Sequence, residues 1–534
     1  MHYDFIIVGA GVSGSALAGR LAQQKPFAKI LLLESGGKNN GAFLKVPASS
    51  ALSIPFRSSV NYGYKTSPHA ALNQRSCYLP LGKGLGGGSA INAMVYIRGH
   101  REDYNQWAQL GCVGWSWPEV LPYFIRAENN STWNTALHGT EGPLQVANLK
   151  TVNPASIKFV EAARHAGFRI NEDFNGEHQD GVGFYQVFQK DGQRFSAYQA
   201  YSQYLTTQNV TVLAHSITQR LIVKNGTVTG VEVQGQNGTQ HFFADKEVIL
   251  CAGAIGTPHL LMCSGIGPAA VLQRAGVPLI HDSPHVGQNL QDHIDYVRCV
   301  KVTGTELLGV SFKGTQRLLK EFKAYRSMRD GMFSSNGAEC GGFLKTAPSL
   351  AQPDIQMHFV IAMMDNHGRT PHYGHGYSCH TCLLKPLSRG HVSITQAGIK
   401  KRPFINIGLL SNSHDTERLI RGIHMMNTIL SQPPLLALNG KPLRPLPIND
   451  AEWESELRRH AQSAYHPVGT CAMGRVVTPT LNYIGLRGLR IADASIMPTI
   501  ISGNTQAACV MIGEKAADLI IADHYSSSYS RCTS

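Results

Sequence analysis

Short apolar runs separated by glycine-rich turns dominate the start of the chain. Residues 4–8 (DFIIV) and 29–34 (KILLLE) are almost continuously apolar, as expected of strands buried on both faces of a sheet. Between them, residues 15–24 place leucines four positions apart, as on one face of a helix. This order of strand, helix and strand predicts a βαβ unit in a parallel sheet.

A glycine pattern follows the first of these predicted strands. Gly9, Gly11 and Gly14 form GxGxxG, and Glu34 ends the second strand 20 residues after Gly14. The glycines permit a tight turn, close approach of a pyrophosphate and close packing of helix on strand, while the acid accepts ribose hydroxyls. The helix N-terminus attracts phosphates. The sequence therefore predicts a dinucleotide site, but this motif does not separate FAD from NAD(P).

The remaining pattern predicts mixed elements. Strands are expected at residues 209–213, 221–223, 228–233 and 246–253, with Asn225-Gly226 as a hairpin turn. Residues 354–393 alternate like strands, and helices are expected at 315–330, 415–430 and 450–464. A lone CxxC, Cys379 to Cys382, is interpreted as a surface loop rather than a zinc or redox site. The last nine residues are polar, and we expect them to be frayed.

Composition narrows the class of protein. Charged residues make up 16% of the 534 residues and hydrophobic residues 43%, which is typical of a large, well-buried enzyme. A disordered chain, a coiled coil and a small disulfide scaffold are excluded. The eleven scattered cysteines are expected to be reduced thiols.

The net charge of +13 comes from dispersed lysines and arginines, so nucleic-acid binding is not predicted. No run of 18 apolar residues is present, which argues against an integral membrane segment. The first residues lead directly into a predicted strand and leave no room for a signal peptide. We therefore expect a cytoplasmic location, with a peripheral position at a membrane left open.

Four further strings stand in a fixed order along the chain. They are GKGLGGGSAIN at 82–92, GAIGTPHLLMCSGIG at 253–267, VGQNLQDH at 286–293, and HPVGTCAMG at 466–474 followed by LRIADAS at 489–495 and SGN at 502–504. Together they resemble the signatures of the glucose–methanol–choline (GMC) oxidoreductases, a family of FAD-dependent alcohol dehydrogenases and oxidases that includes choline dehydrogenases. The resemblance covers nearly the whole chain.

The resemblance implies FAD as the cofactor. The expected FAD-binding residues are Gly9, Gly11, Gly14, Glu34, Gly84, Gly88, Ser89, Asn92, Ala93, Val95, Ile217, Asp493, Ala494, Asn504 and Thr505. Physically, a second glycine-rich loop lets backbone approach the cofactor where a Cβ would intrude. Asp493 suits a cofactor hydroxyl or, alternatively, a helix N-cap. Some relatives attach FAD through a histidine, but Ile91 occupies that place here, so non-covalent FAD is expected.

The resemblance also implies the catalytic pair. Oxidation of an alcohol removes a proton from oxygen and a hydride from carbon, and His466 is the expected general base. Asn504 would hydrogen-bond the substrate oxygen and stabilise a developing alkoxide. Tyr465 and His358 are expected to line the substrate pocket. No metal is expected, because no HExxH occurs and the histidines at 358, 367, 372, 375 and 380 lack regular ligand spacing.

The expected reaction is FAD-dependent oxidation of a CH–OH group to an aldehyde or ketone, by hydride transfer to flavin N5. The electron acceptor is either quinone-type or dioxygen, so dehydrogenase and oxidase both remain open. A non-oxidative lyase of the hydroxynitrile lyase type is the alternative, since a fold does not fix a function. A light-driven decarboxylase is disfavoured because that type lacks the catalytic histidine, and a binding protein with a vestigial flavin site because no motif is eroded.

The motifs at both ends and in the middle imply one interleaved unit. We expect an α/β fold in which a Rossmann-like FAD-binding domain is interleaved with an α+β substrate-binding domain carrying an antiparallel sheet. The FAD-binding domain is assigned residues 1–150, 196–300 and 460–534, and the substrate-binding domain residues 151–195 and 301–459. Neither the alcohol nor the oligomeric state is indicated by the sequence.

Overall fold

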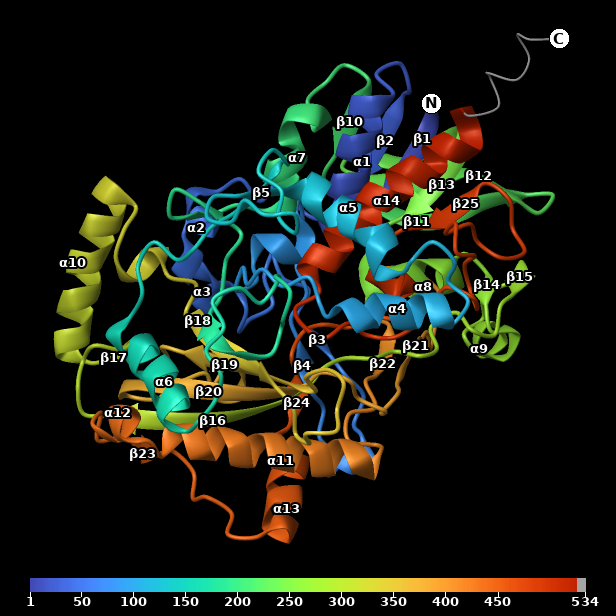
Figure 1. Cartoon of the computed structure of the whole chain (residues 1–534). Helices are drawn as coiled ribbons and strands as arrows, with labels where there is room; N and C mark the ends of the chain where they lie inside the picture. The colour runs from blue at the N-terminus through green and yellow to red at the C-terminus, as the bar shows by residue number, and fades with distance from the viewer. Residues whose placement is uncertain (526–534) are drawn as a thin grey trace.

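Two β-sheets organise the computed structural model of the chain, which describes residues 1–525 (Figure 1). The first has a parallel core whose order is β10 (Val210–Leu213), β2 (Ile30–Leu33), β1 (His2–Val8) and β13 (Gly238–Leu250), with β25 (Leu489–Ile491) beside the end of β13. A hairpin of β12 (Thr227–Gly235) and β11 (Ile217–Lys224) extends it antiparallel. Asn225 and Gly226 both have positive φ at its turn, which confirms the hairpin prediction.

Helices from both ends of the chain pack on this sheet. Helix α1 (Val12–Gln24) lies against α14 (Gln506–Tyr525), and α5 (Trp117–Ala127) and α7 (Ala197–Leu205) flank the pair (Figure 1). The contact between α1 and α14 is so close that a Cβ on Gly513 would lie 2.4 Å from the Ser13 carbonyl oxygen. The buried Glu514 is paired with Arg20 and Arg126, each at 2.7 Å. The last helix therefore completes the layer that the first one begins.

The second sheet is antiparallel. Its order is β23 (Lys441–Pro442), β16 (Ile294–Val302), β20 (Gly374–Leu383), β19 (Ile355–Val360), β18 (Ala338–Leu344) and β7 (Gly181–Phe184), with β17 (Gly309–Val310) and β24 (Gln462–Ser463) at its margins. Helices α11 (Ser413–Leu430) and α6 (Pro154–His165) cover one face (Figure 1). The combination of a Rossmann-like sheet and an antiparallel sheet confirms the expected fold class.

The two-domain division stays a prediction, and the strands bear on its boundaries. Residue 300, the expected end of one segment, lies inside β16, and β24 of the segment starting at 460 pairs with β16. Two local predictions are wrong. The helix expected at 450–464 ends at His460, because the chain turns extended to form β24. Cys379 and Cys382 are buried on β20 rather than exposed in a loop, because α11 packs on one face of that strand and Cys382 lines a cavity on the other.

Other predictions of elements hold. The helix expected at 315–330 is α10 (Phe312–Met328), and α11 covers the one expected at 415–430. All ten cysteines within residues 1–525 are free thiols, as predicted. None of the helices in the same part of the chain combines the length and the apolar character that a membrane span needs. The tail expected to be frayed, 526–534, lies outside the described residues.

Candidate active site

A cavity of about 720 Å³ lies between the two sheets and is lined by residues from both. Its walls come from the first βαβ unit, the glycine-rich segment 80–95, the start of α8 (Gly253–Cys263), the cavity-facing strands of the second sheet and residues 464–467 and 504–509. Ligand sites commonly occupy about 300–1,000 Å³. The volume of the cavity therefore lies within the range of known ligand sites.

The glycines of the first turn have distinct roles. A Cβ on Gly9, whose φ is 107°, would lie 2.4 Å from the Cys251 carbonyl oxygen, and one on Gly14 would lie 1.9 Å from the Gly9 carbonyl oxygen. Both positions therefore need glycine for packing. Gly11 and Gly88 instead border open space in the cavity, so a side chain at either would occupy the room that a cofactor needs.

Glu34 ties three loops together at one end of the cavity. Its Oε1 accepts from the backbone N–H of Gly36 at 2.7 Å and of Gly84 at 3.0 Å, and its Oε2 accepts from Ala10 N at 3.1 Å. Oε1 also accepts from Ser35 Oγ at 3.2 Å, whereas Oε2 accepts from Ala10 N alone, so the second lone pair of Oε2 can accept a ribose hydroxyl. Glu34 thus positions both glycine-rich loops as well as facing the cavity.

Most residues predicted for cofactor binding line the cavity. Those are Gly9, Gly11, Glu34, Gly88, Ser89, Asn92, Ala93, Val95, Ile217, Asp493, Ala494, Asn504 and Thr505. Gly14 and Gly84 do not line it. Gly84, with φ of 100°, packs where a Cβ would lie 2.5 Å from Asn39 Nδ2. Gly14 and Gly84 instead allow the close packing of the two glycine-rich loops, whose other residues line the cavity.

Two of the polar candidates are held by neighbouring protein groups. Asp493 accepts from Gly253 N at 2.8 Å and Thr257 Oγ1 at 2.6 Å, and it caps a short helix through Ser495 N at 2.8 Å. Burial raises the pKa of Asp493, and these hydrogen bonds act against the rise. Asn92 donates to Gln506 Oε1 at 2.6 Å. Both reach the cavity already oriented.

His466 and Asn504 meet across the cavity wall. Asn504 Nδ2 lies 3.2 Å from His466 Nε2, and Asn504 Oδ1 accepts from Gln356 Nε2 at 3.0 Å. The backbone N–H of His466 donates to Asp292 Oδ1 at 2.9 Å. Two segments 38 positions apart are therefore brought within hydrogen-bonding distance at the place where both side chains face the cavity.

A second histidine fixes which nitrogen of His466 carries the hydrogen. His293 Nε2 lies 2.9 Å from the Ile501 carbonyl oxygen, which only accepts, so this nitrogen is the donor. In a neutral imidazole the other nitrogen then accepts, and His293 Nδ1 lies 3.0 Å from His466 Nδ1. His466 therefore donates through Nδ1, and its lone pair is on Nε2, the nitrogen beside Asn504.

Both imidazoles are held in the neutral form. Burial lowers the pKa of His293 to about 3. Burial and, to a smaller extent, the neighbouring His293 lower the pKa of His466 well below its ordinary value. Asp295 opposes this shift only in part. A neutral imidazole whose unprotonated Nε2 accepts from the Asn504 amide can act as a general base when a substrate hydroxyl takes the place of that amide N–H.

Residues of the second sheet line another part of the cavity. His358, on β19, lines the cavity, and its Nδ1 is buried without a hydrogen-bond partner. Tyr465 also lines the cavity, with φ of 68°, and its hydroxyl is hydrogen-bonded to His367. His380 faces His358 across the strand pair and bonds Asp295 Oδ2 at 2.8 Å through Nδ1.

Several functional candidates were missed from the sequence. Asp292 and His293 lie in the QNLQDH string, whose pattern indicates the family but not their roles. Gln356, His380 and Asp295 belong to strands without any motif. His293 could have been identified from the sequence, because a histidine inside a family signature string is a candidate for a functional role. Within residues 1–525, no group of three or more potential ligands is arranged to hold a metal.

Comparisons with known proteins agree with this architecture. The sequence profile of the family described as GMC oxidoreductase matches residues 3–295 and 386–513. An alcohol dehydrogenase [acceptor] of Pseudomonas putida is 40% identical over 529 residues, which cover 97% of this chain and 96% of the relative. An oxygen-dependent choline dehydrogenase of Rhizobium johnstonii is 38% identical over 98% of this chain and 96% of its own length.

Solved structures give the same result. Pyridoxine 4-oxidase from Mesorbium loti superposes with a TM-score of 0.86 at 30% identity, covering 97% of this chain and 98% of that one. A formate oxidase of Aspergillus oryzae RIB40, studied for FAD modification, gives 0.90 at 28% identity over 98% of both chains. The profile matches and the full-length relatives show that this chain belongs to the GMC oxidoreductase family.

Proposed function

We propose that this protein oxidises the CH–OH group of an alcohol to a carbonyl, with FAD as the cofactor and His466 as the general base. The observation that carries the proposal is the contact between His466 and Asn504, whose Nε2 and Nδ2 atoms lie 3.2 Å apart where both side chains face the cavity. A base and a hydrogen-bond donor at adjacent positions are what removal of an alcohol proton requires.

The cavity fits FAD by its own chemistry. Gly11 and Gly88 leave open space where any side chain would project, and the N-terminus of α1 lies beside them with a positive dipole end for phosphates. Glu34 would hold the ribose hydroxyls, and Asn92, Asp493 and Thr505 would contact the rest of the cofactor. When bound, the flavin would supply the two-electron acceptor that takes the hydride.

His466 and Asn504 would share the handling of the hydroxyl. His466 Nε2 would take the proton, while Asn504 Nδ2 would donate to the same oxygen and stabilise its developing negative charge. His293 would keep the His466 ring oriented by accepting from Nδ1. Gln356, which donates to Asn504 Oδ1 at 3.0 Å, would hold the amide so that its N–H groups point to the substrate.

Two finer points belong to the same proposal. Ile91 lines the cavity and cannot bond to a flavin, so we propose that FAD is non-covalent. The relatives named above include an alcohol dehydrogenase and a choline dehydrogenase, so the substrate would be a small alcohol, with a quinone-type acceptor or dioxygen as the oxidant. The cytoplasmic location stays a prediction.

An anaerobic reduction experiment tests the proposal. The purified yellow holoprotein is mixed with a panel of alcohols, including choline and straight-chain primary alcohols, while flavin absorbance is followed. Bleaching by any of them supports alcohol oxidation. No bleaching across the panel would reject it and favour the lyase alternative, which is then assayed directly by release of cyanide from a cyanohydrin. Admitting air afterwards distinguishes an oxidase from a dehydrogenase.

A further inference from the structure

One side of the molecule combines exposed apolar side chains with basic ones. It is formed by residues 42–57, which include α2 (Ala42–Lys45) and α3 (Ser50–Ser53), and by residues 310–328, which include α10. Eight large apolar side chains on these two stretches are between 43% and 77% exposed: Phe43, Leu52, Phe56, Val310, Phe312, Leu319, Phe322 and Met328. Single exposed apolar residues are ordinary, but a cluster of this size indicates an interaction surface. We call it the basic–apolar face.

The two stretches are neighbours in the fold. The short helix η1 (Pro47–Ser49) packs against η4 (Met332–Ser334), which follows α10 in the chain. Phe322 of α10 lies 5.6 Å, between ring centroids, from Phe333 in η4. Figure 1 places α10, α2 and α3 on the same side of the molecule. The exposed apolar residues therefore belong to one face rather than to separate patches.

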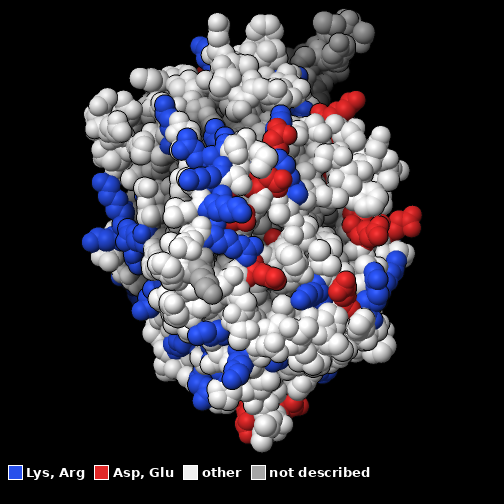
Figure 2. Space-filling model, turned by 90° about the vertical axis from the view of Figure 1, so that its left-hand side faces the viewer, with Lys and Arg blue, Asp and Glu red and all other residues white. Residues whose placement is uncertain are grey.

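The charge of this face is predominantly positive. On α10 the exposed Lys320, Lys323 and Arg326 flank Phe312 and Leu319 on one side of the helix. The single carboxylate of α10, Glu321, is bonded to the Met332 backbone N–H at 3.0 Å. Residues 38–65 contain no Asp or Glu but four cations, Lys38, Lys45, Arg57 and Lys65. Figure 2, which views this side, shows Lys and Arg outnumbering Asp and Glu.

We propose that the basic–apolar face docks on an anionic lipid bilayer. An exposed helix with an apolar stripe between cations lies in the plane of a membrane interface, where its apolar residues enter the headgroup region. Each lysine or arginine near an anionic surface adds about 1 kcal/mol. An uncharged bilayer would lack the attraction to these lysines and arginines and a cationic one would repel them, so the negative lipid headgroup is the partner whose charge fits.

The basic–apolar face adjoins the active-site cavity, so docking could affect how ligands reach the cavity. Ala48, Ala51, Ile54 and Arg57, within residues 42–57, also line the active-site cavity. Docking would therefore bring one wall of the cavity against the bilayer. If the proposed function holds, an apolar alcohol or a quinone-type acceptor dissolved in the membrane would exchange with the cavity through this wall; the docking itself does not depend on the reaction.

Vesicle flotation with the FAD-loaded protein tests the docking. Vesicles of phosphatidylcholine alone are compared with vesicles of phosphatidylcholine and phosphatidylglycerol, at low and high salt. The triple variant Lys320→Gln/Lys323→Gln/Arg326→Gln should bind anionic vesicles about 10²-fold more weakly, at about 1 kcal/mol for each cation. The pair Phe312→Ser/Leu319→Ser should lose about tenfold, because less apolar surface is buried.

A matched control variant removes the same number of positive charges from a different part of the surface. Lys224, Arg274 and Arg475 are exposed away from this face, so Lys224→Gln/Arg274→Gln/Arg475→Gln should bind like the parent protein. Flavin absorbance and the thermal midpoint check that each variant is folded. Failure to bind anionic vesicles at low salt would overturn the proposal. So would equal losses in the two triple variants, unchanged binding of Phe312→Ser/Leu319→Ser, or equal binding to phosphatidylcholine alone.

Discussion

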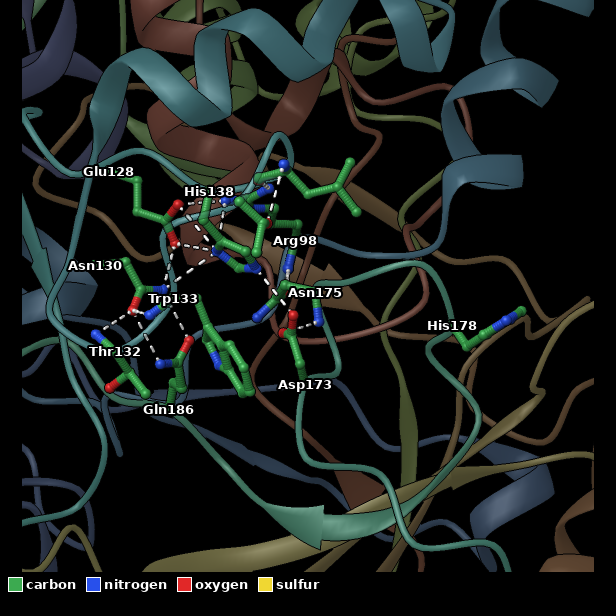
Figure 3. A network of polar contacts seen from close by, with 12 residues as sticks. Arg98, Glu128, Asn130, Thr132, Trp133, His138, Asp173, Asn175, His178 and Gln186 are labelled. Carbon is green, nitrogen blue, oxygen red and sulfur yellow. Dashed lines mark hydrogen bonds and ion pairs between the residues drawn. The ribbon is translucent and has the colours of Figure 1, made fainter.

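Two enclosed histidines in this protein have opposite surroundings. His466 contacts a neutral histidine and an amide, and its pKa lies well below the ordinary value. His138 lies between two carboxylates: its Nδ1 is 3.1 Å from Glu128 Oε1 and its Nε2 is 3.0 Å from Asp173 Oδ2. Figure 3 shows Arg98, Glu128, His138 and Asp173 turned toward one another.

The balance of effects at His138 favours the charged form. Burial by itself lowers the pKa of His138, but the hydrogen bonds to Asp173 and Glu128 outweigh it, so the pKa is raised. Burial raises the pKa of Glu128, yet its bonds from His138 and the charge of Arg98 leave it lowered. Each charge in this cluster has an opposite charge beside it.

The comparison separates a structural histidine from a base. Each titratable group in contact with His138 has a partner of opposite charge. The charged imidazole has no lone pair that could accept a proton. At His466 the absence of a contacting carboxylate leaves Nε2 unprotonated and directed to the cavity. Burial is common to both sites, so the partners and not the burial decide what each histidine can do.

The largest expected effect comes from removing the lone pair at the cavity. His466→Ala should slow flavin reduction by alcohol about 10²- to 10⁴-fold, the usual contribution of a general base. Anaerobic stopped-flow absorbance measures the rate, and an unchanged flavin spectrum shows that the cofactor is still bound. Replacing His138 with Ala serves as the matched control at the other site. A rate near that of the parent protein would rule out His466 as the base.

The next effect falls on stability rather than rate. Glu128→Gln removes the carboxylate that Arg98 and His138 share, and breaking one partner of a buried ion pair costs about 3–5 kcal/mol. Thermal and urea denaturation of the holoprotein measure the loss. The folded fraction should still reduce its flavin at nearly the parent rate. A variant as stable as the parent would show that this cluster is not structural.

A smaller effect is expected from the histidine behind the base. His293→Phe removes the acceptor of His466 Nδ1–H, and leaving a buried donor unpaired costs about 1–3 kcal/mol, so reduction should slow about tenfold. His293→Gln, whose amide oxygen can accept, should restore part of the rate. The pH profile distinguishes this positioning role from a packing defect: a change of tautomer alters the acid limb, whereas lost packing lowers the rate at every pH.

The smallest effects come from pH, with opposite signs at the two sites. Because the His466 pKa is lowered, the base is already deprotonated above pH 6.5, so the reduction rate should stay level there and fall only in more acidic solution. Because the His138 pKa is raised, its contribution to stability is complete below pH 6.5 and is lost as pH rises through the folded-state value. Rates and thermal midpoints of the parent and His138→Gln, measured from pH 5 to 9, check both signs.

Local patterns were enough for the elements whose environment is uniform. The strands at 4–8 and 29–34 are buried on both faces and appear as β1 and β2, and Asn225-Gly226 forms the hairpin turn that its residue types demand. The CxxC on β20 was misread because a histidine-rich strand beside a cavity has the composition of a loop. The helix at 450–464 was drawn too long because nothing local marks where pairing with β16 begins.

Sequence by itself determined the dinucleotide turn, the family and many of the residues that face the cavity, since glycine spacing and signature strings are properties of contiguous segments. Only the tertiary structure decided how those residues act. It placed His293 behind His466, Gln356 behind Asn504 and Glu34 beneath both glycine loops. Tautomers and pKa shifts depend on atoms within a few ångströms, and here those atoms come from segments up to 208 positions apart, so no local pattern could record them.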